Sequence, residues 1–184
     1  MELTDQVTPE IASNAAYQNI LTRTSVRKYT DAKVPDEIVS ALLHAAMAAP
    51  SGVNKQPWEF IVVENREMLM HLAEVLPYAK MAAEAPLAIV VCGSEERMLP
   101  GVDGTLWEQD CSAASENILL AAHALGLGGV WTCLYPHEDR IEAAKRVLSL
   151  SDELIPFNLI PIGHPEREHA PMNKWHPERV HIIS

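Results

Sequence analysis

The chain has 184 residues, which is long enough to bury a hydrophobic core without disulfides or metals. Its composition, 48% apolar and 21% charged, is that of an ordinary globular protein and argues against disorder. Acidic side chains outnumber basic ones 25 to 14, for a formal net charge of −11. The chain therefore lacks the positive charge that a protein needs to bind a nucleic acid or an anionic membrane surface.

The N-terminal sequence and the cysteines indicate where the protein resides. Residues 1–6 have neither a basic region nor an apolar core, so we expect no signal peptide. The longest apolar stretch, residues 118–131, is too short for a membrane span. Three cysteines, an odd number, favour a reducing compartment. Since no repeat or linker divides the chain, we expect a cytoplasmic protein with a single domain over residues 1–184.

The first half of the chain predicts alternating helices and strands. A first helix is expected at residues 9–21. A second begins at Pro35, carries apolar side chains on one face, and ends at the proline–glycine turn of residues 49–52. Residues 58–64 then predict a strand, and residues 68–78 predict a short helix.

An apolar run at residues 87–92 shows no alternation, which is typical of a strand buried on both faces. A loop at residues 95–104 separates it from the longest predicted helix, at residues 107–125. That helix is apolar on almost every side, so we expect it to be buried in the core or against another subunit.

The last part of the chain predicts a strand at residues 130–133 and a helix at residues 137–148. Residues 154–162 predict a strand that contains two prolines, and we therefore expect it at a sheet edge or with a bulge. The polar tail ends in the strand-like residues 180–183, which we expect to dock on another part of the protein. Together these elements predict an α+β domain with four or five strands and about as many helices.

Arg23, Ser25 and Arg27 form the first candidate site. Because they alternate, their side chains point the same way in an extended segment. Guanidinium forks match phosphate oxygens bidentately, so the group suits a phosphate or another polyanion. A solvated turn at the end of a helix is the alternative, since the helix dipole favours cations there.

The loop between the second helix and the first strand is the second candidate. Ser51, Asn54 and Gln56 can hydrogen-bond the edge of a flat polar ring system. Ordinary turn chemistry explains Pro50 and Gly52, but it does not explain this density of polar side chains.

Three other motifs are weaker candidates for a functional site. Gly126, Gly128 and Gly129 lie between a helix and a strand, the reverse of a dinucleotide-binding fingerprint, so we expect them to end the helix and let the next strand pack closely. His164 and His169 lack the spacing of a zinc site, and the cysteines lie in apolar segments. We assign no metal site and no catalytic side chain.

Five segments occur in a characteristic order: Arg23-Thr-Ser-Val-Arg27-Lys-Tyr29, Ala48-Ala-Pro50-Ser-Gly-Val-Asn54-Lys-Gln56-Pro-Trp58, Ala85-Pro-Leu-Ala-Ile-Val-Val, Leu119-Leu-Ala-Ala-His-Ala-Leu-Gly-Leu-Gly128 and Asn173-Lys-Trp-His-Pro-Glu-Arg179. In this order and spacing they resemble the nitroreductase family of FMN-dependent oxidoreductases. The resemblance covers nearly the whole chain from about residue 20 onward. It implies an α+β fold with a central mixed sheet flanked by helices. It also implies an intertwined homodimer whose C-terminal extension reaches the partner subunit.

The resemblance also implies which residues bind FMN and which part of the cofactor each of them contacts. Arg23, Ser25 and Arg27 would bind the phosphate, the ribityl chain and the pyrimidine edge, and Thr24 would contribute its backbone. Lys174 would complete the phosphate clamp from the tail. In one departure from the family, Met172 stands where a second basic residue is often found.

The rest of the implied site lies around the flavin ring. The residues expected to come from the other subunit and cover the flavin are Pro50, Ser51, Gly52 and Asn54. Cys133 and Leu134 would present backbone groups to the central ring. In a second departure, other members carry glycine or isoleucine–glycine at this place.

The implied activity is a ping-pong transfer of hydride from NAD(P)H through FMN to a small oxidised acceptor, such as a nitroaromatic or a quinone. Two alternatives stay open at this point. One is flavin-dependent dehydrogenation, dehalogenation or other chemistry of the superfamily, and the other is a flavin-binding protein without turnover. The implied partners are NAD(P)H, the acceptor and a second copy of the chain, with no nucleic acid and no membrane.

Overall fold

The computed structural model describes residues 7–183. Residues 1–6, on which the expectation of no signal peptide rests, lie outside this part of the chain. No helix within residues 7–183 is both long enough and apolar enough to cross a bilayer.

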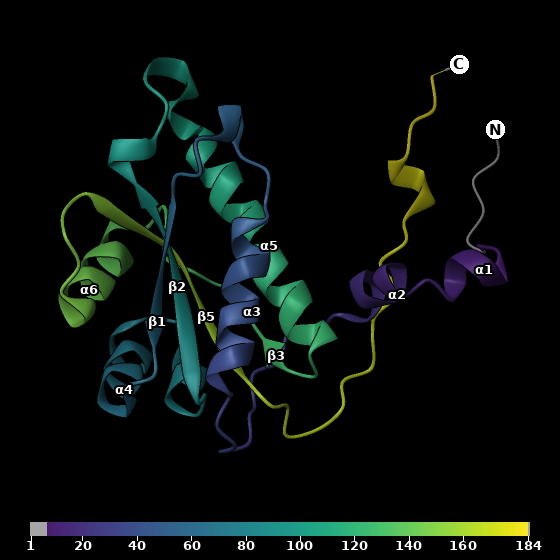
Figure 1. Ribbon diagram of the computed structural model, residues 1–184, viewed down its shortest axis with the longest axis horizontal. Coiled ribbons are helices and arrows are strands. Elements are labelled where there is room, and N and C mark those ends of the chain that lie inside the picture. The colour runs from purple at the N-terminus through teal and green to yellow at the C-terminus, as the bar shows by residue number, and fades with distance from the viewer. Residues whose placement is uncertain (1–6, 184) are drawn as a thin grey trace.

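The described chain contains six α-helices and five strands (Figure 1). The helices are α1 (Pro9–Ala12), α2 (Ala15–Thr22), α3 (Asp36–Met47), α4 (Arg66–Val75), α5 (Leu106–Ala124) and α6 (Glu138–Leu148). The strands are β1 (Trp58–Val63), β2 (Leu87–Ser94), β3 (Gly128–Gly129), β4 (Thr132–Cys133) and β5 (Leu154–Gly163). The fold is therefore α+β, as the sequence predicts.

The strands form one sheet in the order β1-β2-β5-β3, and β4 also pairs with β5. Every pairing between these strands is antiparallel. The parallel part of the expected mixed sheet is limited to one isolated bridge, between Ser25 and Gly129. That bridge attaches the first candidate segment to the sheet.

Helices cover both faces of the sheet (Figure 1). α3 and α5 pack on one face, and α4 and α6 pack on the other, so the core has two apolar layers. β2 lies between them with every residue buried, which confirms the expectation for residues 87–92. α1, α2 and the C-terminal tail extend beyond α5, away from the sheet.

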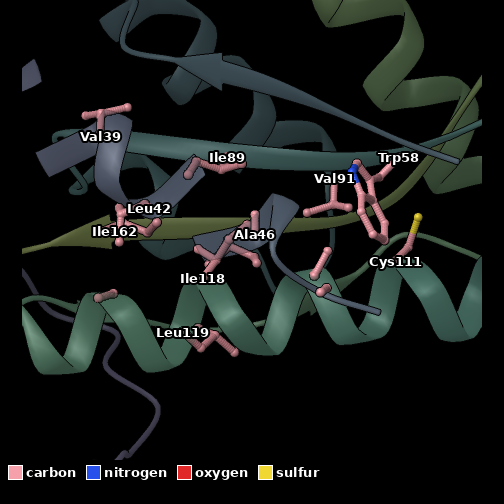
Figure 2. Packing of buried hydrophobic residues seen from close by; sticks show 14 of the residues in the cluster. Val39, Leu42, Ala46, Trp58, Ile89, Val91, Cys111, Ile118, Leu119 and Ile162 are labelled. Carbon is pink, nitrogen blue, oxygen red and sulfur yellow. The ribbon is translucent and has the colours of Figure 1, made fainter. Parts of the chain in front are cut away.

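α5 is the longest helix, and one of its faces is buried along the whole length, whereas Gln109, Glu116 and Ala124 are exposed. Its side chains Cys111 and Ile118 face α3 and the sheet (Figure 2). The side chains of α3 that meet them include Leu42 and Ala46, both fully buried. Burial of a leucine or isoleucine side chain contributes about 1.5–3 kcal/mol, so this layer fixes α5 firmly against the sheet.

The single helix expected at residues 9–21 is two helices. Asn14 caps α2, because its side-chain oxygen accepts a hydrogen bond from the N–H of Tyr17 at 3.1 Å. The hydroxyl of Ser13 donates to the carbonyl of Glu10 at 3.0 Å. These local bonds compete with helix continuation, and they end α1 before α2 begins.

The edge position expected for residues 154–162 is wrong, although the bulge is present. β5 lies inside the sheet, because the two-residue strands β3 and β4 cover its outer side. The register with β2 shifts between Val91 and Cys92, next to Pro156 on β5. A proline is tolerated there because a bulge removes the need for a ladder hydrogen bond.

Three further expectations differ from the structure. The strand expected at residues 130–133 is split into β3 and β4, which Val130 and Trp131 separate. The loop expected at residues 95–104 contains two 3-10 turns. The strand expected at residues 180–183 is not formed, and Ile183 is 99% exposed, since no strand among residues 7–183 lies beside it.

Candidate functional site

The candidate segment 23–27 leaves the C-terminus of α2 and lies against β3. The N–H of Val26 donates to the carbonyl of Gly129 at 3.0 Å, next to the bridge between Ser25 and Gly129. Val26 is buried, with 4% of its surface exposed. In an extended segment the neighbours of an inward residue point outward, so Ser25 and Arg27 face away from the core.

Close approach to Gly128 fixes this packing. A β-carbon at Gly128 would lie 2.4 Å from Val26 Cγ2 and 2.5 Å from Val26 Cβ. Gly126 has a φ of +77° and ends α5. The expectation that the glycines end the helix and allow close packing is confirmed, and the element that packs closely is the candidate segment itself.

Tyr29 anchors the far end of the segment. Its phenol oxygen lies 2.7 Å from the carbonyl oxygen of Val26 and 3.0 Å from that of Pro161. Burial raises the pKa of this phenol far above its ordinary value, so the hydroxyl remains a donor at any physiological pH. The motif that contains Tyr29 did not predict this role, because its partner Pro161 lies 132 residues away in the sequence.

A cavity of about 990 Å³ lies between α2, the segment and the tail. The predicted residues that line it together are Arg23, Thr24, Ser25, Arg27 and Lys174. All charged residues in its described lining are cations, in a chain whose net charge is −11. Concentrated guanidinium, ammonium and hydroxyl donors are what binding of a phosphate group requires.

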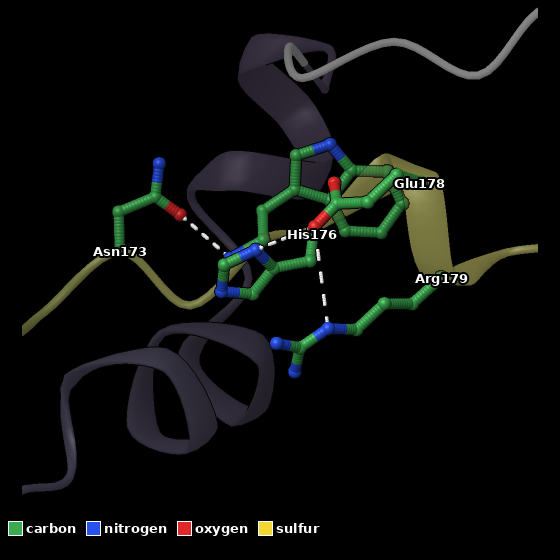
Figure 3. A network of polar contacts seen from close by, with 5 residues as sticks. Asn173, His176, Glu178 and Arg179 are labelled. Atoms are coloured by element: carbon green, nitrogen blue, oxygen red, sulfur yellow. Dashed lines mark hydrogen bonds and ion pairs between the residues drawn. The ribbon is translucent and has the colours of Figure 1, made fainter.

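The tail on either side of residue 174 carries a local network of polar contacts (Figure 3). The N–H of Trp175 donates to the side-chain oxygen of Asn173 at 2.9 Å, which turns the backbone around Lys174. Nearby, His176 Nδ1 lies 2.9 Å from Glu178 Oε1. Asn173 and Trp175 also line the cavity, and the sequence analysis did not assign either of them to the site.

The cations of the cavity differ in their surroundings. Arg23 is mostly buried, with 16% of its side chain exposed, and its Nε lies 3.4 Å from Glu116 Oε1 on α5. Within residues 7–183, neither Arg27 nor Lys174 has a carboxylate within ion-pair distance. The cavity therefore retains a net positive charge that an anion can neutralise.

α2 is fixed to α5 by polar contacts that the sequence analysis missed. His123 Nε2 lies 2.8 Å from Thr22 Oγ1, and the side-chain amide of Asn19 donates to the carbonyl of Leu120 at 3.0 Å. Their partners are 101 residues away in sequence, so no local pattern could reveal them.

The polar loop after α3 does not reach this cavity in the same chain. Pro50, Ser51, Gly52 and Asn54 are absent from the described lining. The N–H of Gly52 instead donates to Asp110 of α5 at 2.9 Å.

The loop holds an unusual backbone. Val53, Asn54 and Gln56 have φ values of 51°, 56° and 49°, in the left-handed region that side chains rarely adopt. Hydrogen bonds from the Gln56 N–H to the Ser51 hydroxyl at 3.0 Å and from the Gln56 amide to Asn54 at 2.9 Å maintain it. Val53 is 82% exposed. A strained backbone with an exposed apolar tip is typical of a surface that meets a partner.

Cys133 and Leu134 also lie outside the cavity lining. Leu134 is buried, and its N–H already donates to the carbonyl of Phe157 at 3.1 Å. It therefore cannot offer that N–H to a flavin at the same time. Cys133 is exposed, and its carbonyl accepts a hydrogen bond from Arg140 at 3.1 Å.

Comparison with known proteins identifies similar chains. The sequence pattern of the nitroreductase family matches residues 20–80 and 68–164. A protein of Methanothermobacter thermautotrophicus that carries the name NADH dehydrogenase/NAD(P)H nitroreductase is 45% identical over 183 residues, 99% of this chain and 94% of its own.

Solved structures agree with this match. A protein of the same name from Parabacteroides distasonis has a TM-score of 0.88 at 45% identity, with 94% of this chain and 99% of that chain covered. A nitroreductase-type protein of Desulfovibrio desulfuricans, crystallised in complex with FMN, has a TM-score of 0.80 at 32% identity, with 94% and 98% covered.

Proposed function

The chain belongs to the nitroreductase family, and on that premise we propose that it is an FMN-dependent NAD(P)H oxidoreductase that reduces a small nitroaromatic, quinone or similar acceptor. The observation that carries the proposal is the cationic cavity between α2 and the tail. We take residues 1–184 as one FMN-binding domain. The unpaired cysteines are consistent with the cytoplasm.

The donors around the cavity fit FMN. Arg23, Ser25 and Arg27 would bind the phosphate, the ribityl chain and the pyrimidine edge, with Thr24 contributing its backbone. Following the family resemblance, which gives the phosphate to the first residue of the segment and to the tail lysine, we assign the phosphate to Arg23 and Lys174, whose guanidinium and ammonium groups are usual phosphate ligands. The volume of about 990 Å³ lies at the upper end for small-molecule sites, which suits a large cofactor.

When bound, FMN would supply the redox chemistry and carry electrons from NAD(P)H to the acceptor. The side chains hold and orient the cofactor, and their positive charge neutralises its phosphate. The described lining holds neither a carboxylate nor an imidazole, so we assign no catalytic acid or base.

We propose that the site is completed by a second copy of the chain in an intertwined homodimer. The loop residues Pro50, Ser51, Gly52 and Asn54 would then cover the flavin of the partner, which is consistent with the exposed tip at Val53. Apolar side chains also remain exposed on α2 and on the tail, among them Ile20, Leu21 and Ile183. Burial of such a patch favours association.

The first test is replacement of the arginines. Arg23→Ala and Arg27→Ala each remove charged hydrogen bonds worth about 1.5–3 kcal/mol, so we expect the Kd of FMN to rise by about ten- to a hundredfold. Flavin fluorescence titration of the apoprotein measures this. Arg146→Ala, at an exposed position of α6 across the sheet, is the matched control. Full flavin occupancy of both variants would disprove the site.

An anaerobic absorbance spectrum with NADPH or NADH separates the remaining alternatives. We expect the flavin bands to bleach within seconds. Bands that persist would indicate a flavin-binding protein without turnover, and turnover with a dehydrogenase substrate alone would indicate the other chemistry of the superfamily.

A mixed dimer tests the shared site. Arg23→Ala and Asn54→Ala chains are each expected to bind FMN poorly when alone. If the two residues come from different subunits, a heterodimer of the variants contains one intact site and one doubly altered site. We therefore expect co-refolding to restore about half of the flavin binding in the heterodimer. No recovery would place both residues in one subunit.

A further inference from the structure

We propose that His123 is a positioning residue for Arg23, and that the Thr22–His123 hydrogen bond sets the affinity of the cavity for the phosphate group of its ligand. This inference rests on the proposed function, because it takes Arg23 as a phosphate ligand. It concerns residues of α5 that do not line the cavity themselves.

The hydrogen-bond geometry defines the donor. Thr22 Oγ1 lies 2.7 Å from the carbonyl oxygen of Gln18 and 2.8 Å from His123 Nε2. A carbonyl oxygen can only accept, so the single hydroxyl proton of Thr22 belongs to the bond with Gln18. His123 must then donate from Nε2 to the threonine oxygen, which fixes the imidazole as the Nε2–H tautomer.

The charge state of His123 is consistent with this bond. Burial, and secondarily the positive charge of Arg23, lower the pKa of the imidazole below its ordinary value. The ring is therefore neutral at pH 7 and adds no positive charge of its own.

α2 has little else to hold it in place. None of its residues is buried, so apolar packing does not determine where its C-terminus lies. Its contacts with α5 are made through Asn19, Thr22 and Arg23, which meet Leu120, His123 and Glu116 respectively.

These six residues form two matching stripes. Positions 116, 120 and 123 share one face of α5, and positions 19, 22 and 23 share one face at the end of α2. Thr22 directly precedes Arg23, so the bond to His123 fixes the backbone from which the guanidinium extends. Loss of that bond lets Arg23 move without unfolding the core, since α5 is held by its apolar face.

The experiment compares FMN with riboflavin, which lacks the phosphate. For His123→Ala we expect the Kd of FMN to rise by about three- to tenfold, as for loss of one hydrogen bond, and the Kd of riboflavin to stay unchanged. His123→Gln keeps an N–H donor and is expected to restore most of the FMN affinity. His71→Ala, at an exposed position of α4 across the sheet, is the control.

A double-mutant cycle tests whether His123 acts through Arg23. The Arg23→Ala/His123→Ala variant is expected to bind FMN no more weakly than Arg23→Ala alone. If His123→Ala proves too unstable to purify, Thr22→Val removes the acceptor instead, and the same pattern is expected.

Three results would overturn the inference while leaving the proposed function intact: unchanged FMN affinity in His123→Ala, equal losses for FMN and riboflavin, or additive losses in the double variant. A different result, normal FMN binding by Arg23→Ala, would overturn the phosphate site itself and this inference with it.

Discussion

The contact between Gly128 and Val26 gives a quantitative prediction. In Gly128→Ala the new β-carbon would lie 2.4 Å from Val26 Cγ2, 2.5 Å from Val26 Cβ and 2.9 Å from Val26 Cγ1. Ordinary contact begins at 3.4 Å. Rotation of the valine side chain does not move its Cβ, so the backbone of segment 23–27 must shift by about 1 Å.

Two effects of Gly128→Ala are expected. Overpacking lowers the free energy of unfolding by about 1–3 kcal/mol. The shifted segment also misplaces Arg23, Ser25 and Arg27 around their ligand, which costs about 1.4 kcal/mol, or tenfold in the Kd of FMN. Urea unfolding of the apoprotein measures the first effect, and fluorescence titration measures the second.

Two further sets of variants test whether the contact between Gly128 and Val26 causes these effects. Gly126→Ala places its β-carbon in open space but at a φ of +77°, so it is expected to cost roughly 1 kcal/mol of stability with no loss of FMN affinity. Combining Gly128→Ala with Val26→Gly removes the clash, whereas Val26→Ala leaves the 2.5 Å contact. If Val26→Ala restores FMN binding as well as Val26→Gly does, or if Gly128→Ala binds FMN normally, the argument from this contact is wrong.

The other predictions concern Tyr29 and the cysteines. Tyr29→Phe removes the single hydroxyl proton that the carbonyls of Val26 and Pro161 share, and should lower the free energy of unfolding by about 1–3 kcal/mol; an unchanged urea midpoint would contradict this. Only Cys133 should react with a thiol reagent in the native protein. Burial raises the pKa of Cys111 far above its ordinary value and that of Cys92 to about 12, so both stay protonated and unreactive. Rapid reaction of all three cysteines would contradict their burial. Since the folded thiol pKa values exceed the unfolded ones, stability should be complete below the ordinary thiol range and fall as the pH rises above it.

The sequence predicted the elements whose pattern is strong and local. The unbroken apolar run of β2 predicted a strand that is buried throughout, and the apolar composition of α5 predicted a helix that packs in the core, where one of its faces is buried. The alternation of Arg23, Ser25 and Arg27 predicted a common side, and the three residues line one cavity.

What the sequence could not predict depends on distant partners. β5 was expected at an edge or with a bulge because of its prolines, and the bulge is present; the edge was wrong because β3, a pair of glycines without a strand signal, and β4 both pair with β5. The break between α1 and α2 depends on whether Asn14 caps a helix or lies inside one, and both are compatible with the apolar spacing. The roles of Tyr29 and His123 depend on contacts more than 100 residues apart.

The attachment of the anion-binding segment also defines an order of assembly. β1 and β2 are neighbours in sequence, but Tyr29 meets a carbonyl of β5 that is 132 residues away. Contacts of such long separation form late, because the entropy of closing the loop is lost before the contact can compensate for it. Residues 23–29 leave the ribosome early and must wait for β5, which is made near the end of synthesis. The completion of the sheet and the anchoring of residues 23–29 therefore both depend on β5, and a chain that still lacks β5 has only the β1–β2 pair and no anchored segment.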